Sequence, residues 1–158
     1  MGFGWNNHKI RGGLTMLKGI PSILTPELLK VLMEMGHGDE LVIADGNFPK
    51  FAHAKQVIRC DGHGVPELLD AILKFMPLDK YVDHPVILME VLPNDPVIPV
   101  IWDEYKELID KHGNDALKIL PINKFEFYER AKNAYAVVTT SEAALYANII
   151  LKKGVVVE

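Results

Sequence analysis

The chain has 158 residues, a formal net charge of −4 and an apolar fraction of 49%. This length suits one domain, in which about two-thirds of the unfolded surface becomes buried. The 17 basic and 21 acidic residues form no basic cluster, which disfavours a nucleic-acid-binding protein and favours a small neutral ligand. No apolar run reaches the roughly 18 residues of a membrane span, and a single cysteine, Cys60, cannot form an internal disulfide. We therefore expect a cytoplasmic protein that contacts neither nucleic acid nor membrane.

The first fifteen residues are rich in glycine and asparagine and lack the apolar stretch of a secretory signal. Patterned sequence begins only at Met16. The sequence predicts an added leader or disordered arm over residues 1–15, followed by one domain over residues 16–158.

Helices are predicted at four places along the chain. Thr25 is a suitable N-cap, Pro26 suits the first turn, and Glu27 faces the positive end of the helix dipole, so a helix is expected from here to about Met35, before Gly36. The other three are expected from Pro66 to about Met76, across Trp102, Tyr105, Leu108 and Ile109 before Gly113, and from Asn123, with Glu126 completing a capping-box-like pattern.

Short apolar runs between these helices predict strands. The run from Leu41 to Ala44 is wholly apolar between polar neighbours, which is typical of a strand buried on both faces. Further apolar runs lie at Val86–Val91, Leu117–Ile122, Tyr135–Thr139, Asn148–Leu151 and Val155–Val157. Alternating helices and apolar strands predict a single α/β domain with helices flanking a mostly buried sheet.

His37 lies between Gly36 and Gly38, in the turn between the first helix and the first strand. Two glycines allow another group to approach the imidazole closely. A histidine at a helix end can act as acid or base near neutral pH, so His37 is a candidate catalytic residue. A solvated loop histidine is the alternative.

Asp45 and Asp61 are the candidate carboxylates. Asp45 ends the buried strand, at the edge where open α/β sheets usually bind ligands, although Asp-Gly is also a common turn dipeptide. Its position eight residues after His37 favours a role beside that histidine. Asp61 stands next to Cys60 and near His63, but the spacing matches no metal-ligand signature, so no metal site is predicted.

Tyr146, Ala147 and Asn148 precede the last apolar run and offer an aromatic ring and an amide. An aromatic ring can stack on a sugar, and an amide can both donate to and accept from hydroxyl groups. Tyr128, in the segment Tyr128-Glu129-Arg130, belongs by itself to a pattern typical of surface ion pairs.

Several segments, in their order and spacing, resemble the L-fucose mutarotases over essentially Met16 to Val157. They are Gly36-His37-Gly38-Asp39-Glu40, Ala44-Asp45, Phe48-Pro49, Arg59-Cys60-Asp61-Gly62, Phe125-Glu126-Phe127-Tyr128-Glu129-Arg130-Ala131 and Tyr146-Ala147-Asn148-Ile149. The related D-ribose pyranases are similar mainly at Gly36-His37 and Tyr146-Ala147-Asn148.

This resemblance implies an α/β fold in a closed ring of subunits, such as a decamer, with sites near subunit contacts and with neither cofactor nor metal. It implies His37 as the proton donor and Asp61 as a further functional carboxylate. Sugar binding is implied for Asp45, Lys124, Tyr128, Tyr146, Ala147 and Asn148. The family often has Arg where this chain has Lys124, and a lysine cannot reproduce a bidentate guanidinium contact.

The implied reaction interconverts the α and β anomers of L-fucose. Opening the hemiacetal ring requires removal of a proton from the anomeric hydroxyl and delivery of a proton to the ring oxygen, which general acid–base groups can perform. Two alternatives remain: pyranose–furanose interconversion of D-ribose, which Ala147 favours and the Phe125–Arg130 segment disfavours, and a non-catalytic monosaccharide-binding regulatory protein.

Overall fold

The computed structural model describes residues 16–114 and 116–158, so the expectation for residues 1–15 lies outside the described residues. The described residues form one mixed sheet of six strands and four helices. The helices are α1 (Pro26–Glu34), α2 (Val65–Leu73), α3 (Ile101–Lys111) and α4 (Lys124–Asn133). The strands are β1 (Glu40–Ala44), β2 (Val57–Cys60), β3 (Val86–Met89), β4 (Ile119–Ile122), β5 (Ala136–Thr140) and β6 (Ile149–Lys152).

The helix starts follow the predicted capping residues. The hydroxyl of Thr25 accepts a hydrogen bond from the N–H of Leu28 at 3.1 Å, and the side chain of Asn123 accepts from the N–H groups of Phe125 and Glu126. Each cap satisfies N–H groups that would otherwise lack a partner in the first helical turn. The α2 helix ends at Leu73, three residues before the predicted end.

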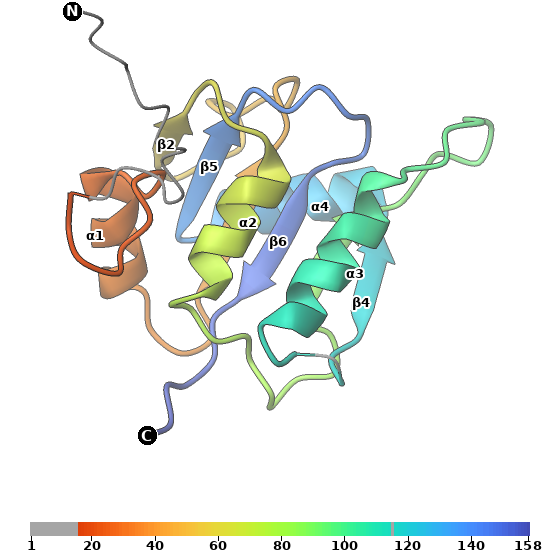
Figure 1. The fold of residues 1–158 in the computed structure, drawn as a ribbon. Helices are drawn as coiled ribbons and strands as arrows, with labels where there is room; N and C mark the ends of the chain where they lie inside the picture. The colour runs from red at the N-terminus through yellow and green to blue at the C-terminus, as the bar shows by residue number, and fades with distance from the viewer. Residues whose placement is uncertain (1–15, 115) are drawn as a thin grey trace, which may run out of the picture.

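The strand order is β2-β5-β1-β6-β3-β4. The β1, β2 and β5 strands are mutually parallel, β3 is parallel to β4, and β6 runs antiparallel to both of its neighbours, β1 and β3. Figure 1 shows the arrows of β2 and β5 pointing to the upper edge and that of β6 to the lower edge. The carboxyl ends of five strands and the amino end of β6 therefore meet at one edge of the sheet.

Side chains of β1 enter two apolar clusters on opposite faces of the sheet. Leu41 and Ile43 pack in the larger cluster, together with residues of α1, α2 and α3, whereas Val42 and Ala44 pack with residues of α4 in a smaller one. All four are fully buried. The predicted burial of this strand on both faces is confirmed, and Figure 1 shows α4 behind the sheet.

Two strand expectations differ from the structure. The β2 strand was not predicted, because it is an edge strand whose exposed Arg59 interrupts the apolar pattern. The apolar segment Val155–Val157 adds no strand and is exposed. No helix among residues 16–114 and 116–158 is long and apolar enough to cross a membrane.

Candidate active site

Polar residues from four parts of the chain meet at the edge of the sheet that holds the carboxyl ends. Asp45 follows β1, Glu90 follows β3, Lys124 follows β4, and Asn148 precedes the antiparallel β6. They enclose a pocket of about 220 Å³. Its lining consists of Asp45, Asn47, Phe48, Met89, Glu90, Leu92, Asp95, Lys124, Tyr128, Leu145, Tyr146 and Asn148.

Asp45 and Asn148 form the buried base of this pocket. The side-chain oxygen of Asn148 accepts a hydrogen bond from the Asp45 N–H at 2.7 Å, and its amide donates to Asp45 Oδ2 at 3.0 Å. Burial raises the pKa of Asp45, and the charge of Glu142 adds to this effect, although hydrogen bonds from Asn47, Phe48 and Asn148 oppose it. A carboxylate with a raised pKa is a better proton acceptor than an exposed one.

Tyr146 adopts an unusual backbone conformation, with φ at +57°. A non-glycine residue in this left-handed region is strained, and such strain persists only where surrounding contacts impose it. Here α3 supplies those contacts: Trp102 Nε1 donates to the carbonyl of Tyr146 at 2.8 Å, and the Tyr105 hydroxyl donates to that of Ala147 at 2.6 Å. The Tyr146 hydroxyl then donates to Asp95 Oδ2 at 2.6 Å at the pocket wall.

Ala147 differs from its two neighbours. It is fully buried in the apolar core on the α1–α3 side of the sheet and does not line the pocket. Its carbonyl anchors the segment to Tyr105. The structure therefore gives Ala147 a place between two pocket residues without contact to the pocket itself.

Lys124 and Tyr128 lie on the first turns of α4 and also line the pocket. Lys124 Nζ lies 5.6 Å from the centroid of the Tyr128 ring, within range of a cation–π contact. The Tyr128 ring also packs edge-on against Phe48. Its neighbours do form ion pairs, Arg130 with Glu40 and Glu129 with Lys132, so the surface-pair interpretation holds for those two residues while Tyr128 faces the pocket.

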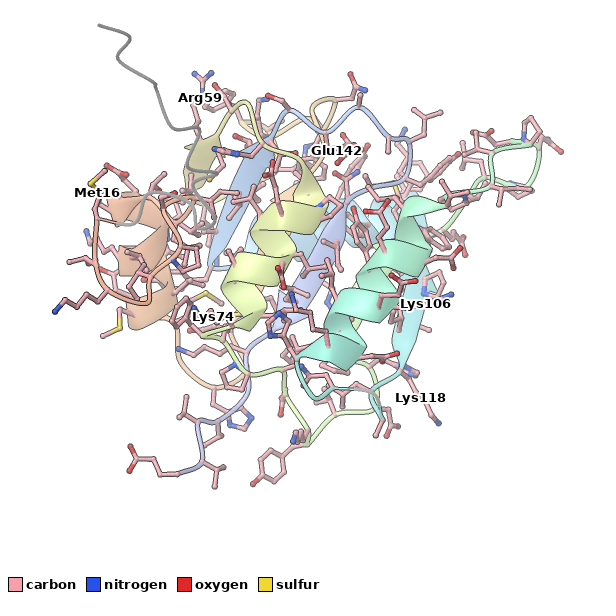
Figure 2. All side chains as sticks on the ribbon, in the orientation of Figure 1. Met16, Arg59, Lys74, Lys106, Lys118 and Glu142 are labelled. Carbon is pink, nitrogen blue, oxygen red and sulfur yellow. The ribbon has the colours of Figure 1, made fainter. Side chains whose placement is uncertain are left out.

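Asp61 is placed outside the pocket. It follows β2, which β5 separates from β1 in the sheet, and its side chain is 53% exposed. It forms an ion pair with Arg59, whose side chain Figure 2 shows extending outward at the upper end of β2. The hydrogen bond that Arg59 donates to Asp61 lowers the pKa of this carboxyl group.

His37 lies at the opposite end of the sheet from Asp45. The turn that carries it precedes β1, Asp45 follows β1, and five residues of strand span roughly 16 Å. Because β1 lies between them, His37 and Asp45 of one protomer are too far apart for one pyranose ring to contact both. His37 instead contacts Asp79, with Nε2 3.1 Å from Oδ1.

Sequence reasoning missed several of the lining residues, above all Glu90 and Asp95. The apolar run from Val86 to Val91 placed Glu90 within a strand, whereas β3 ends at Met89 and leaves Glu90 at the ligand-binding edge. Three pocket carboxylates face one ammonium group, which disfavours anionic ligands. Within residues 16–114 and 116–158, no three His, Cys, Asp or Glu side chains are grouped so as to hold a metal ion.

The fold and the pocket define an α/β protein with a polar, partly aromatic pocket at the edge of its sheet. Residues 18–156 match the model of the RbsD / FucU transport protein family, and the chain belongs to this family. It is 53% identical over 150 residues to the fucose mutarotase of Danio rerio, covering 90% of this chain and 96% of that protein.

Solved structures show the same fold. A crystal structure of the fucose mutarotase from Streptococcus pneumoniae in complex with L-fucose is 54% identical, covers 89% of this chain and 100% of that chain, and has a TM-score of 0.83. The structure of Bacillus subtilis RbsD complexed with D-ribose has a TM-score of 0.67 at 24% identity, covering 85% and 95% of the two chains. The latter likeness concerns the fold alone.

Proposed function

We propose that this protein is an L-fucose mutarotase, which interconverts the α and β anomers of the free sugar by opening and closing its hemiacetal ring. The observation that carries the proposal is the buried Asp45–Asn148 pair at the base of a pocket in a chain of this family. Relatives that share about half of its sequence are named fucose mutarotase, and one was crystallised with L-fucose.

The pocket chemistry suits a neutral monosaccharide. Asp45, Glu90 and Asn148 offer acceptors and an amide donor for several hydroxyl groups. Tyr128 and Tyr146 add aromatic faces for the apolar side of a pyranose ring. The excess of carboxylates over ammonium groups would repel a phosphate, so we expect the free sugar and not its phosphate ester to bind.

The proton transfers follow from the hemiacetal. A protonated His37 donates its proton to the ring oxygen while the bond from that oxygen to the anomeric carbon breaks. The Asp45 carboxylate accepts the proton of the anomeric hydroxyl, and the resulting open-chain aldehyde rotates about its C1–C2 bond. Return of both protons closes the ring on the other face of the carbonyl. Two such positioned groups provide roughly 10²–10⁴-fold acceleration.

This assignment requires a second copy of the chain. His37 and Asp45 lie at opposite ends of β1, so a site that uses both combines His37 from one protomer with the pocket of the next. A contact between two different surfaces, repeated from copy to copy, forms a ring when its rotation closes on itself. We therefore propose a homo-oligomeric ring, a decamer being one such assembly, in which each contact completes one site.

Interconversion of D-ribose forms is the second candidate activity. In the sequence, Ala147 favoured this ribose activity, but the Ala147 side chain is buried in the core and does not line the pocket. The likeness to RbsD is in fold at 24% identity. L-fucose is therefore the preferred substrate in this proposal.

A non-catalytic sugar-binding protein would need the same pocket without a proton donor. Saturation-transfer NMR separates the possibilities, because it measures the rate at which magnetisation passes between the two anomeric protons. We expect the protein to accelerate exchange of L-fucose more than that of D-ribose. Binding of L-fucose in calorimetry without acceleration would identify a non-catalytic protein, and faster exchange of ribose would identify a ribose enzyme.

A further inference from the structure

The hydroxyl group of Tyr146 contacts the loop that joins β3 to α3, residues 90–100. It donates a hydrogen bond to Asp95 Oδ2 at 2.6 Å and accepts one from the N–H of Leu92 at 3.3 Å. Within residues 16–114 and 116–158, no third hydrogen bond reaches this oxygen. A tyrosine hydroxyl has a single hydrogen to donate. Because that hydrogen points to Asp95, the hydroxyl can offer a ligand in the pocket only an acceptor.

The Asp95 carboxylate is held by its own loop. Its Oδ1 accepts a hydrogen bond from the N–H of Val97 at 3.1 Å, and its backbone N–H donates to the carbonyl of Leu92 at 3.0 Å. Such a side-chain bond to the N–H two residues later stabilises a turn. Pro93 and Pro96 stand on either side and restrict the backbone further. Figure 1 shows this loop projecting beyond the upper end of α3. The direction of the carboxylate is therefore set without a ligand.

The first turn of α3 anchors both the loop and Tyr146. The backbone N–H of Trp102 donates to the carbonyl of Pro99, at the end of the loop, at 3.0 Å. The indole Nε1 of the same residue donates to the carbonyl of Tyr146 at 2.8 Å. Tyr146 is held in a left-handed conformation, with φ at +57°, which a non-glycine residue keeps only under such constraints. One helix start thus sets the distance between the hydroxyl and Asp95.

The charges around the pair favour a neutral hydroxyl. The hydrogen bond to Asp95 raises the pKa of the Tyr146 hydroxyl, although the hydrogen bond from Leu92 opposes this effect. The other charged groups that line the pocket are Asp45, Glu90 and Lys124. The hydroxyl therefore keeps its hydrogen at neutral pH, on the side of the Asp95 carboxylate.

We infer that Asp95 is a positioning residue for substrate recognition: it fixes the hydrogen of the Tyr146 hydroxyl, so that this hydroxyl accepts a hydrogen bond from one hydroxyl group of the sugar. This inference rests on the proposed function, because the sugar is the ligand of that function. A site built to accept from a hydroxyl rejects a ligand that lacks it, since the acceptor is then left without a partner. Asp95 acts through Tyr146 and so sets which ring substituents the pocket admits.

The first test replaces Asp95 with asparagine in the full chain. The amide still offers an oxygen to the N–H of Val97, but its NH₂ group can donate to the Tyr146 hydroxyl, whose hydrogen is then no longer fixed. We expect the Kd for L-fucose in calorimetry, and the KM for exchange, to rise by about fivefold or more. The maximal exchange rate should change much less, because the contact is made before and during ring opening alike. A native Kd in this variant would overturn the inference.

A second tyrosine–carboxylate pair provides a matched control. The Tyr135 hydroxyl donates to Glu34 Oε2 at 2.7 Å, and neither residue lines the pocket. Glu34→Gln should leave the Kd for L-fucose unchanged. An equal rise of Kd in Asp95→Asn and Glu34→Gln would contradict a specific role of Asp95.

Fluorinated sugars test the direction of the hydrogen bond. Fluorine in place of one ring hydroxyl of L-fucose removes a donor and keeps a weak acceptor, so at one ring position it faces the Tyr146 oxygen with another acceptor. We expect this analogue to bind the wild type about tenfold more weakly than L-fucose. The loss should be smaller in Asp95→Asn, where the hydroxyl can turn its hydrogen toward the fluorine. Losses that Asp95→Asn leaves unchanged, or reduces equally at every ring position, would refute the inference.

A double-mutant cycle tests whether Asp95 acts through Tyr146. Tyr146→Phe removes the hydroxyl and should weaken binding of L-fucose by itself. Adding Asp95→Asn to Tyr146→Phe should then weaken it no further. A further loss in the double variant would identify a direct contact of Asp95 with the sugar or a purely structural role, and would refute the positioning role.

Carbon NMR of the tyrosine Cζ atoms gives a readout besides binding and activity. In Asp95→Asn the pKa of Tyr146 should fall toward its ordinary value of about 10, and the pKa of Tyr135 should not move. The hydrogen bond to Glu34 raises the pKa of Tyr135, so Glu34→Gln should lower that pKa alone. An unchanged pKa of Tyr146 in Asp95→Asn would contradict the inference. Should the wild type bind L-fucose with these couplings but leave anomer exchange unaccelerated, the proposed function fails while the role of Asp95 stands.

Discussion

Asp45 and Asn148 are 103 residues apart in sequence and are joined by two hydrogen bonds, backbone to side chain at 2.7 Å and side chain to side chain at 3.0 Å. Both are buried at the base of the pocket. The pair is possible because β6 runs antiparallel to β1, which places the residue before β6 beside the residue after β1. These hydrogen bonds thus orient the Asp45 carboxylate, the proposed proton acceptor, and link the end of β1 to the start of β6.

Replacing Asn148 with alanine tests the double role of this pair. The variant leaves the buried Asp45 N–H without its partner and removes one of the hydrogen bonds to the carboxylate, which should cost about 2 kcal/mol or more of unfolding free energy. Binding of L-fucose should weaken as well, because the pocket loses an amide. Urea unfolding and calorimetry measure the two effects. Asn133→Ala, which removes an exposed side chain at the end of α4, should change neither, and an unaltered Asn148→Ala would refute the role of the pair.

His37→Gln should slow anomer exchange by about 10²-fold or more, because it removes a titrating proton donor. Affinity for L-fucose should change little, since binding is assigned to Asp45, Tyr146 and Asn148. His63→Gln, on a half-buried histidine outside the pocket, is the control. A folded His37→Gln with native rates would exclude His37 as the acid.

Mixed assemblies test whether a site is shared between protomers. His37→Gln and Asp45→Asn subunits, each inactive alone, should regain activity when refolded together. In an equal, random mixture, about one quarter of the contacts would combine a native His37 with a native pocket. Activity of mixed and unmixed samples by saturation-transfer NMR measures this recovery. A mixture as inactive as its components would contradict the shared site.

Tyr105→Phe tests the support of the strained Tyr146. The change removes a buried hydrogen bond to the Ala147 carbonyl, which should cost about 1 kcal/mol of unfolding free energy. Relaxed backbone at Tyr146 should raise KM for L-fucose more than it lowers the maximal rate. Tyr135→Phe, which loses a surface hydrogen bond to Glu34, should leave KM unchanged. Equal KM values in the wild type and both variants would show that the Tyr146–Ala147 segment keeps its conformation without the hydrogen bond from Tyr105.

Stability should fall in acid for a specific reason. Hydrogen bonds from Lys111 and His112 lower the pKa of Asp70, and those from Tyr81 and His37 lower that of Asp79 although burial opposes them. A carboxyl whose pKa is lower when folded stabilises the native state above its unfolded value of about 3.9, and this contribution is lost as the pH falls through the folded value. Urea midpoints should therefore decrease below about pH 4.

The Asp70→Asn variant sharpens this test. It should lose less stability than the wild type between neutral pH and acid, because one of the two lowered carboxyl groups is gone. Asp103→Asn, at an exposed position of α3, should follow the wild type. Parallel acid curves for wild type and Asp70→Asn would disprove the contribution of Asp70.

The sequence by itself determined the local structure. Thr25 and Asn123 specified two helix starts, and the apolar run at Leu41–Ala44 specified a buried strand, because capping and burial depend on neighbouring residues. It also indicated five of the twelve pocket residues, among them Asp45 and Asn148, which each adjoin a strand end. The β2 strand escaped detection because an edge strand needs no continuous apolar pattern.

Only the tertiary structure decided which of these residues meet. Strand order and direction brought Asn148 to Asp45 and placed His37 at the other end of the sheet, beside Asp79. The tertiary structure also pairs Asp61 with Arg59 at the sheet edge and buries Ala147 in the apolar core. These placements could not be deduced from the spacing of residues in the sequence. A strand carries residues that are close in sequence to opposite edges of a sheet, and pairing between strands joins residues that are far apart in the chain.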